Sequence, residues 1–302
     1  MLMPSLYTFH YKLHEVAGYV NWLYFFHAWG FPARFSTIAQ IHGCDSCRAT
    51  WLASFPESER SRAAEAMQLY KEAMRMLRSL DTHNQAHVRL GLYECNADGD
   101  DIIIYPDSRL TFLRQQHEPF LCLSDFVRPL NENGTRDRIA LFAASVDAAM
   151  EQQYAPDSDQ PDDYRHLLGQ TLADRLAEAA VEKVHEEVRR SLWGYAPNEH
   201  LSIADLHAER FQGIRPAVGY PSMPDQSLNF VLDSIIDFSS IGIDLTEHGA
   251  MRPHASVSGL MISHPDACYF SIGKIGEDQL YSYASRRGMA ADTLRSYLTG
   301  NL

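Results

Sequence analysis

The amino-acid sequence predicts an α+β fold in which helices flank an antiparallel sheet. Strand and helix patterns do not alternate regularly along the chain, as a doubly wound parallel sheet would require. The longest helical pattern, over residues 163–192, is long enough for a central helix of the fold. With 302 residues and 45% hydrophobic content the chain can bury a large core, and we expect one domain over residues 1–302.

An amphipathic helix is expected over residues 58–80. Ala63, Met67, Tyr70 and Met74 recur at intervals of four and three, which places them on one helix face. The charged residues between these positions belong on the solvent side.

Three strands are expected after this helix. Apolar residues alternate with others in "VRLGLYE" (88–94), and "DIIIY" (101–105) is a β-branched run. The third strand, "RIALFAASV" (138–146), follows the pair Asn133-Gly134, which is a strong signal for a tight turn.

The central helix is expected to begin after a connection rich in proline and aspartate, "YAPDSDQPDDY" (154–164). Acidic residues that include Glu178 and Glu182 run along one face of this helix. Apolar residues repeat every four positions along another face: Leu172, Leu176, Ala180, Val184 and Val188.

The C-terminal region predicts two more strands and a helix. "SVSGLMIS" (256–263) and "CYFSIG" (268–273) have strand composition, and "EDQLYSYASRRGM" (277–289) has a helical pattern. Gly288 is expected to end this helix, because glycine readily adopts the left-handed conformation of a C-cap.

Charge and hydropathy exclude two classes of partner. The net charge of -13 repels nucleic acid backbones and anionic lipid. The longest apolar runs fall far short of the roughly 20 residues that span a bilayer. The N-terminus lacks the basic region and apolar stretch of a signal peptide, so we expect a cytoplasmic protein that binds neither nucleic acid nor a membrane.

Common cofactor and hydrolase motifs, such as G-x-G-x-x-G and G-x-S-x-G, are missing from the sequence. "HGCDSC" offers His42, Cys44 and Cys47 to a metal ion or a redox pair, but no second cluster completes a four-ligand zinc site. The favoured interpretation is ordinary thiols, and no metal ligand is assigned. A thiol or metal function remains a weaker hypothesis.

The loop "GIRPAVGYP" (213–221) is the most specific feature of the sequence. Pro216 pushes Arg215 toward an extended backbone, and Gly219 allows a close approach. Arg215 offers a planar donor fork for a carboxylate or phosphate, and Tyr220 offers an aromatic face. A salt bridge that holds the loop to a neighbouring helix is an equally good interpretation at this point.

This loop resembles the R-x-x-x-G-Y loop of the activation domain of cobalamin-dependent methionine synthase, a module that binds S-adenosylmethionine. The resemblance extends over residues 19–302, so residues 1–18 are expected to form an N-terminal extension. The matching segments, in order, are "FFHAWGF", "LRQQ", "LSDFVRP", "LADRLAEA", "WGYAPNEHLS", "GIRPAVGYPSMP", "LTEHGAMRPHASVSG", "SHPDACYFSIGKI" and "DQLYSYASRRGM".

The resemblance implies a binding site for S-adenosylmethionine and a set of residues for it. It assigns Arg215 to the ligand's carboxylate and Asp125, in "SDFV", to its ammonium group. The other implied contacts are Glu178, Glu209, Ala217, Gly219, Tyr220, Tyr269 and Phe270.

The resemblance also implies a function in the methionine synthase system. In the family, this domain moves over a cobalamin domain whose cofactor has been oxidised to cob(II)alamin. An electron from a flavodoxin-type partner and the methyl group of S-adenosylmethionine then restore methylcobalamin. The sulfonium already activates the methyl group, so no catalytic residue is expected. The homocysteine, folate and cobalamin modules have no room here, which implies action in trans, or as a separated piece, on cobalamin carried by a partner domain.

Two segments depart from the family pattern. "YPSMPDQS" (220–227) stands where many relatives carry cysteine and histidine after the tyrosine. "AMRPHASVSG" (250–259) carries Arg252 and His254 where an aromatic or small residue is usual. Both segments are expected to face the corrin. A second hypothesis therefore stays open, namely a sensor that binds S-adenosylmethionine without methyl transfer.

Overall fold

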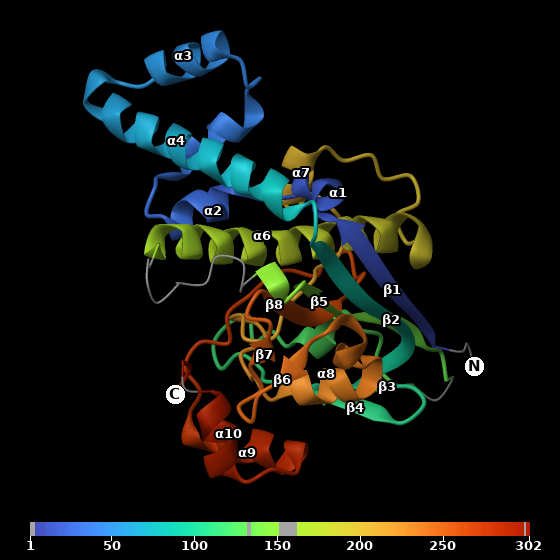
Figure 1. Ribbon diagram of the computed structural model, residues 1–302. Helices are drawn as coiled ribbons and strands as arrows, with labels where there is room; N and C mark the ends of the chain where they lie inside the picture. The colour runs from blue at the N-terminus through green and yellow to red at the C-terminus, as the bar shows by residue number, and fades with distance from the viewer. Residues whose placement is uncertain (1–3, 132–133, 151–161, 299) are drawn as a thin grey trace.

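A twisted, six-stranded antiparallel sheet forms the centre of the fold (Figure 1) in a computed structural model, which describes residues 4–131, 134–150, 162–298 and 300–302. The strand order is β4-β3-β2-β5-β8, and β1 also pairs with β2. The strands are β1 (Ser5–Lys12), β2 (Gln85–Asp98), β3 (Asp101–Ile104), β4 (Ser108–Thr111), β5 (Asp137–Val146) and β8 (Ser256–Met261). The sheet confirms the predicted fold class.

Strand β5 lies between β2 and β8 and is buried on both faces. Phe142 and Ala144 belong to the core on one side of the sheet, and Ile139 and Leu141 to the core on the other. This double burial explains why the strand is apolar from Ile139 to Ala144 and does not alternate there with polar residues. Full burial of one side chain such as Phe142, which is 1% exposed, is worth roughly 1.5–3 kcal/mol.

The central helix α6 (Asp163–Glu187) crosses one face of the sheet and packs against β2, β5 and β8 (Figure 1). It begins where the Asp162 side chain accepts a hydrogen bond of 3.0 Å from the backbone N–H of Arg165, an N-cap that satisfies a free donor. One π-helical turn, η3 (Val188–Leu192), continues it. The predicted helix over residues 163–192 is thus confirmed, while residues 154–161 of the predicted connection lie outside the described residues.

The N-terminal helices pack on the outer side of α6. They are α1 (Leu13–Ala17), α2 (Trp22–Ala28) and α4 (Glu57–Leu80). The bounds of α4 confirm the amphipathic helix predicted over residues 58–80. The 3₁₀ helix η1 (Ala33–Gln40), α3 (Asp45–Ala53) and the first half of α4 form an arm that projects away from the sheet (Figure 1).

Shorter elements cover the opposite face and the edges of the sheet. They are η2 (Leu123–Phe126), α8 (Leu228–Ile236), η4 (Phe238–Ile241), the two-stranded sheet β6 (Asp244–Leu245) and β7 (Met251–Arg252), α9 (Glu277–Arg287) and α10 (Ala291–Tyr297). The short helix α7 (Ile203–His207) lies instead beside α1 on the α6 side (Figure 1), where the His207 ring and the Tyr19 carbonyl are 3.0 Å apart. Gly288 has φ of 63° and ends α9 as predicted. Among the described residues, no helix combines the length and hydrophobicity needed to cross a bilayer.

The structure differs from the sequence prediction at residues 268–273. "CYFSIG" (268–273) forms no strand, because its aromatic residues face a cavity instead of a neighbouring strand. Most of the predicted N-terminal extension, residues 5–17, forms β1 and α1. β1 pairs with β2 from Ser5↔Leu92 to Lys12↔Gln85, so this segment is an integral part of the sheet. In the predicted turn before β5, Asn133 lies outside the described residues.

Candidate ligand-binding site

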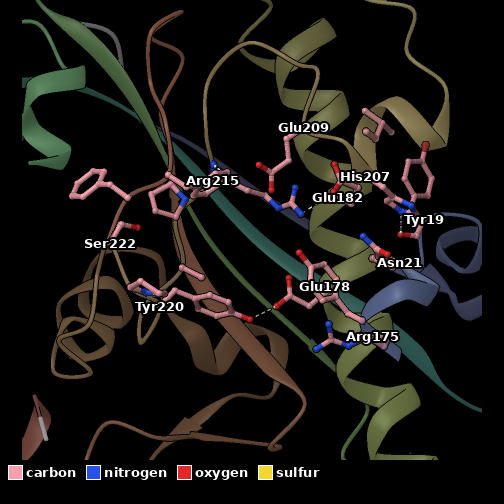
Figure 2. A pocket seen from close by; sticks show the side chains of 18 of the residues that line it. Tyr19, Asn21, Arg175, Glu178, Glu182, His207, Glu209, Arg215, Tyr220 and Ser222 are labelled. Atoms are coloured by element: carbon pink, nitrogen blue, oxygen red, sulfur yellow. Dashed lines mark hydrogen bonds and ion pairs between the residues drawn. The ribbon is translucent and has the colours of Figure 1, made fainter. Parts of the chain in front are cut away.

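A cavity of about 510 Å³ lies between α6 and the loop formed by residues 213–222 (Figure 2). The segment around the start of α2, the region of α7 and the segment 269–271 complete its walls. The lining residues are Tyr19, Asn21, Tyr24, Arg175, Glu178, Ala179, Glu182, Leu206, His207, Glu209, Arg215, Pro216, Ala217, Tyr220, Pro221, Ser222, Tyr269, Phe270 and Ser271. The cavity thus collects most of the residues that the resemblance assigns to a ligand.

The loop of residues 213–222 is held against the edge of β8. The backbone N–H of Leu260 donates to the carbonyl of Pro216 at 2.9 Å, and that of Val218 donates to Ser258 at 2.9 Å. Gly259 permits this approach, because a Cβ atom there would lie 2.2 Å from the Pro216 oxygen. The loop therefore behaves as an irregular extra strand whose extended backbone presents Arg215 to α6.

Gly219 turns the loop back at the rim of the cavity. Its φ is +86°, a conformation that L side chains rarely adopt. Its N–H donates to the carbonyl of Met223 at 2.8 Å. Gly219 is therefore required for the turn that positions Tyr220, although it does not itself line the cavity.

Arg215 forms an ion pair with Glu182 of α6, with 2.7 Å between Nη2 and Oε2. The side chains of Arg215 and Glu182 are only 18% and 7% exposed. Burial alone would lower the pKa of Arg215, but the negative charge of Glu182 outweighs it and raises the pKa. The backbone N–H of Arg215 donates to the Tyr269 hydroxyl at 3.0 Å. The sequence leaves two interpretations of Arg215 open, a salt bridge to a helix and a position that faces a ligand. In the structure Arg215 both forms the salt bridge and lines the cavity.

Three carboxylates face this cavity: Glu178, Glu182 and Glu209. Oε1 of Glu182 is buried without a hydrogen-bond partner among the described residues. Burial raises the pKa of Glu209, and the charge of Glu182 adds to this effect. The cavity wall also carries two guanidinium groups, those of Arg175 and Arg215. The balance of three carboxylates against two guanidinium groups favours a ligand that brings its own cation.

Tyr220 and Glu178 are paired across the cavity (Figure 2). The tyrosine hydroxyl donates to Oε1 of Glu178 at 3.0 Å. The negative charge of Glu178, together with burial, raises the pKa of Tyr220, which keeps the phenol protonated and able to donate. Tyr220 is 50% exposed, so one part of its ring forms the rim of the cavity.

Asp125 is not brought to this cavity. Its carboxylate accepts two hydrogen bonds of 2.7 Å from Arg114 and one of 2.8 Å from the backbone N–H of Cys122. Burial would raise the pKa of Asp125, but the bonds from Arg114 and Cys122 lower it. Asp125 does not line the cavity in this structure, and its assignment to the ligand's ammonium group stays a prediction.

Sequence reasoning missed several residues of the cavity wall, among them Asn21, Arg175, Glu182 and His207. Glu182 follows Glu178 by one helical turn on the same face of α6, and this spacing could have identified it. Asn21 accepts a hydrogen bond of 3.1 Å from the backbone N–H of Leu23 and caps α2. Asn21 thus caps a helix and lines the cavity at the same time, and one pattern in the sequence marks both.

Fold and site together define an α+β domain with a cavity for a small ligand that carries both charges. Residues 12–288 match the family model of the vitamin B12-dependent methionine synthase activation domain, so the chain belongs to this family. A crystal structure of the MetH reactivation domain bound to AdoHcy is similar to it, with a TM-score of 0.85 and 34% sequence identity. That similarity covers 99% of this chain and 90% of the other.

Proposed function

We propose that this chain binds S-adenosylmethionine in the cavity between α6 and the loop of residues 213–222, and that it serves in the reductive reactivation of cob(II)alamin. One observation carries the proposal. Arg215 and Glu182, an ion pair with 2.7 Å between its atoms, both line this cavity in a member of the activation-domain family. A similar domain has been crystallised with AdoHcy, which shares the amino-acid moiety and the adenosine of S-adenosylmethionine.

The carboxylate and the ammonium group of the ligand's amino-acid moiety match the opposite charges of Arg215 and Glu182. A guanidinium carries five N–H donors, and Arg215 uses Nη2 for Glu182, so donors remain for the ligand's carboxylate. Glu182 offers its second oxygen to the ammonium group in place of Asp125. The pairing of Arg215 with Glu182 therefore sets the spacing between the two charges that the ligand must match.

Aromatic and backbone groups account for the rest of the ligand. Tyr220, fixed by Glu178, lies beside the methionine moiety, where its ring face suits the sulfonium. Tyr269 and Phe270 supply apolar surface, and Ala217 lets the loop backbone approach the ligand. When bound, S-adenosylmethionine supplies a methyl group that its sulfonium already makes electrophilic. The residues of the cavity therefore need only orient it and exclude water.

The cobalamin is carried by a partner domain, and a flavodoxin-type protein supplies the electron. The chain acts in trans or as a separated piece of a methionine synthase system in the cytoplasm. We assign no catalytic acid or base to it, because the reaction transfers no proton from the protein.

A calorimetric titration with S-adenosylmethionine tests the binding site. Arg215→Ala should weaken binding by roughly 2–5 kcal/mol, because a buried charged hydrogen-bond partner is lost. Arg210→Ala is the matched control, since Arg210 is 70% exposed and pairs with Asp205 outside the cavity. Equal affinities for the wild type and Arg215→Ala, with both proteins folded by circular dichroism, would refute the assigned site.

A second candidate is a sensor that binds S-adenosylmethionine without transferring its methyl group. The departures from the family pattern favour it. The side chain of His254 is 82% exposed and lies 3.5 Å from Asp174 of α6, and Arg252 is exposed on β7. Two basic residues change the partner that this surface can bind.

A further inference from the structure

Outside the ligand cavity, three potential metal ligands converge at the start of α3. His42, Cys44 and Cys47 each contribute one ligand atom, and these atoms all lie within 4.8 Å of one another. In the described part of the chain, no other group of histidine, cysteine and carboxylate side chains gathers in this way. The two thiols are free and half-buried, and His42 is exposed.

The backbone around these residues is already ordered. Cys44 is the N-cap of α3, and its sulfur accepts a hydrogen bond of 3.3 Å from the backbone N–H of Cys47. Both sulfurs are therefore presented on the same side of one helical turn. Asp45, which lies between them in sequence, pairs with Arg48 at 3.3 Å and is not part of the cluster.

We propose that His42, Cys44 and Cys47 form a binding site for Zn²⁺ with one open coordination position. Thiolate and imidazole ligands select soft or borderline cations. In a tetrahedral site, bond lengths of about 2.3 Å to sulfur and 2.0–2.1 Å to nitrogen give ligand separations of about 3.5–3.8 Å. Modest side-chain rotations close the observed arrangement to that geometry, and His42 has the freedom to make them.

The charge balance also fits a divalent cation. Each thiol releases its proton to solvent as it binds, so two thiolates and one neutral imidazole neutralise Zn²⁺. A redox pair needs only two sulfurs. A metal site needs a third donor close to both of them, and His42 provides it. With three protein ligands, the fourth position remains for water or an external donor.

The site lies on the arm, on the far side of α6 from the sheet (Figure 1). A bound ion would join the segment before α3 to its first turn and so stabilise the arm. Metal binding and the binding of S-adenosylmethionine are therefore separate properties, and either can fail without the other.

The test is a titration of the reduced, metal-free full chain with Co²⁺, followed by Zn²⁺. We expect one equivalent of Co²⁺ to give a thiolate-to-cobalt absorption band that Zn²⁺ displaces. The band should be lost in Cys44→Ser and Cys47→Ser. His42→Ala should weaken affinity more than about tenfold, since even loss of a residue that supports a ligand costs 10–100-fold.

Two features make the variants informative. Serine is a favoured N-cap residue, so Cys44→Ser should keep α3 folded. Cys268 is exposed and outside the cluster, so Cys268→Ser should bind Co²⁺ like the wild type. The proposal is overturned if the wild type shows no band, if the Cys44 and Cys47 variants bind as it does, or if a Cys44–Cys47 disulfide forms in a glutathione buffer containing Zn²⁺.

Discussion

At the scale of single residues, the two carboxylate oxygens of Glu182 differ in their contacts. One oxygen pairs with Arg215 at 2.7 Å and the other has no partner in the described structure. A buried carboxylate oxygen without a partner costs free energy, so a ligand cation that reaches it regains that cost on binding. We therefore propose Glu182 as the ammonium partner in place of Asp125, whose oxygens already accept hydrogen bonds from Arg114.

A pair of isosteric substitutions separates these two carboxylates. Glu182→Gln keeps the shape of the side chain but removes its charge, and should weaken binding of S-adenosylmethionine by about 1.5–3 kcal/mol. Asp125→Asn should leave the affinity unchanged, since its carboxylate lies outside the cavity. Calorimetry on both variants decides the matter, and the reverse pattern would restore Asp125 as the partner.

At the scale of elements, the binding loop depends on β8. Residues 216 and 218 bond to the β8 backbone, and this contact fixes the distance between Arg215 and α6. Gly259 is the position where the two backbones come closest. The geometry of the cavity is therefore set by a strand that does not itself line it.

Gly259→Ala should move this loop. The added Cβ would lie 2.2 Å from the Pro216 oxygen and 2.9 Å from Cα of Ala217, both backbone atoms, and such overpacking costs roughly 1–3 kcal/mol. We expect a lower unfolding midpoint in urea and weaker binding of S-adenosylmethionine. Gly18→Ala is the control, because a Cβ there meets nothing within 4 Å, and unchanged affinity in Gly259→Ala would contradict the dependence on β8.

Local patterns predicted some elements well and others poorly. The helices α4 and α6 were predictable because their periodicity and caps are properties of contiguous residues. β1 was not recognised, since its partner β2 lies some 80 residues along the chain and its residues alternate between half-buried and exposed positions. "CYFSIG" resembles a strand in composition, but its aromatic residues line a cavity. Asp125 and Glu182 carry the same charge, and only the tertiary fold determines that Glu182 lines the cavity and Asp125 does not.

At the scale of the whole molecule, the cavity opens beside exposed aromatic residues. Tyr24 and Tyr220, which both belong to the cavity wall, are 55% and 50% exposed. Exposed aromatic rings around a cavity are typical of a surface that meets a partner. A methyl donor held in this cavity can reach an acceptor only if such a partner docks at the opening.

Remethylation of a separate cobalamin domain tests this arrangement. With S-adenosylmethionine and a reduced flavodoxin-type protein, the wild type should convert cob(II)alamin to methylcobalamin, followed by its absorption spectrum. Arg215→Ala should fail, while Cys268→Ser, which alters an exposed thiol outside the cavity wall, should be active. If the wild type binds S-adenosylmethionine but transfers no methyl group to any cobalamin domain of the same cell, the sensor is the correct function. In that case the basic residues Arg252 and His254 mark the surface that has lost the corrin, and replacing them with small residues should restore docking.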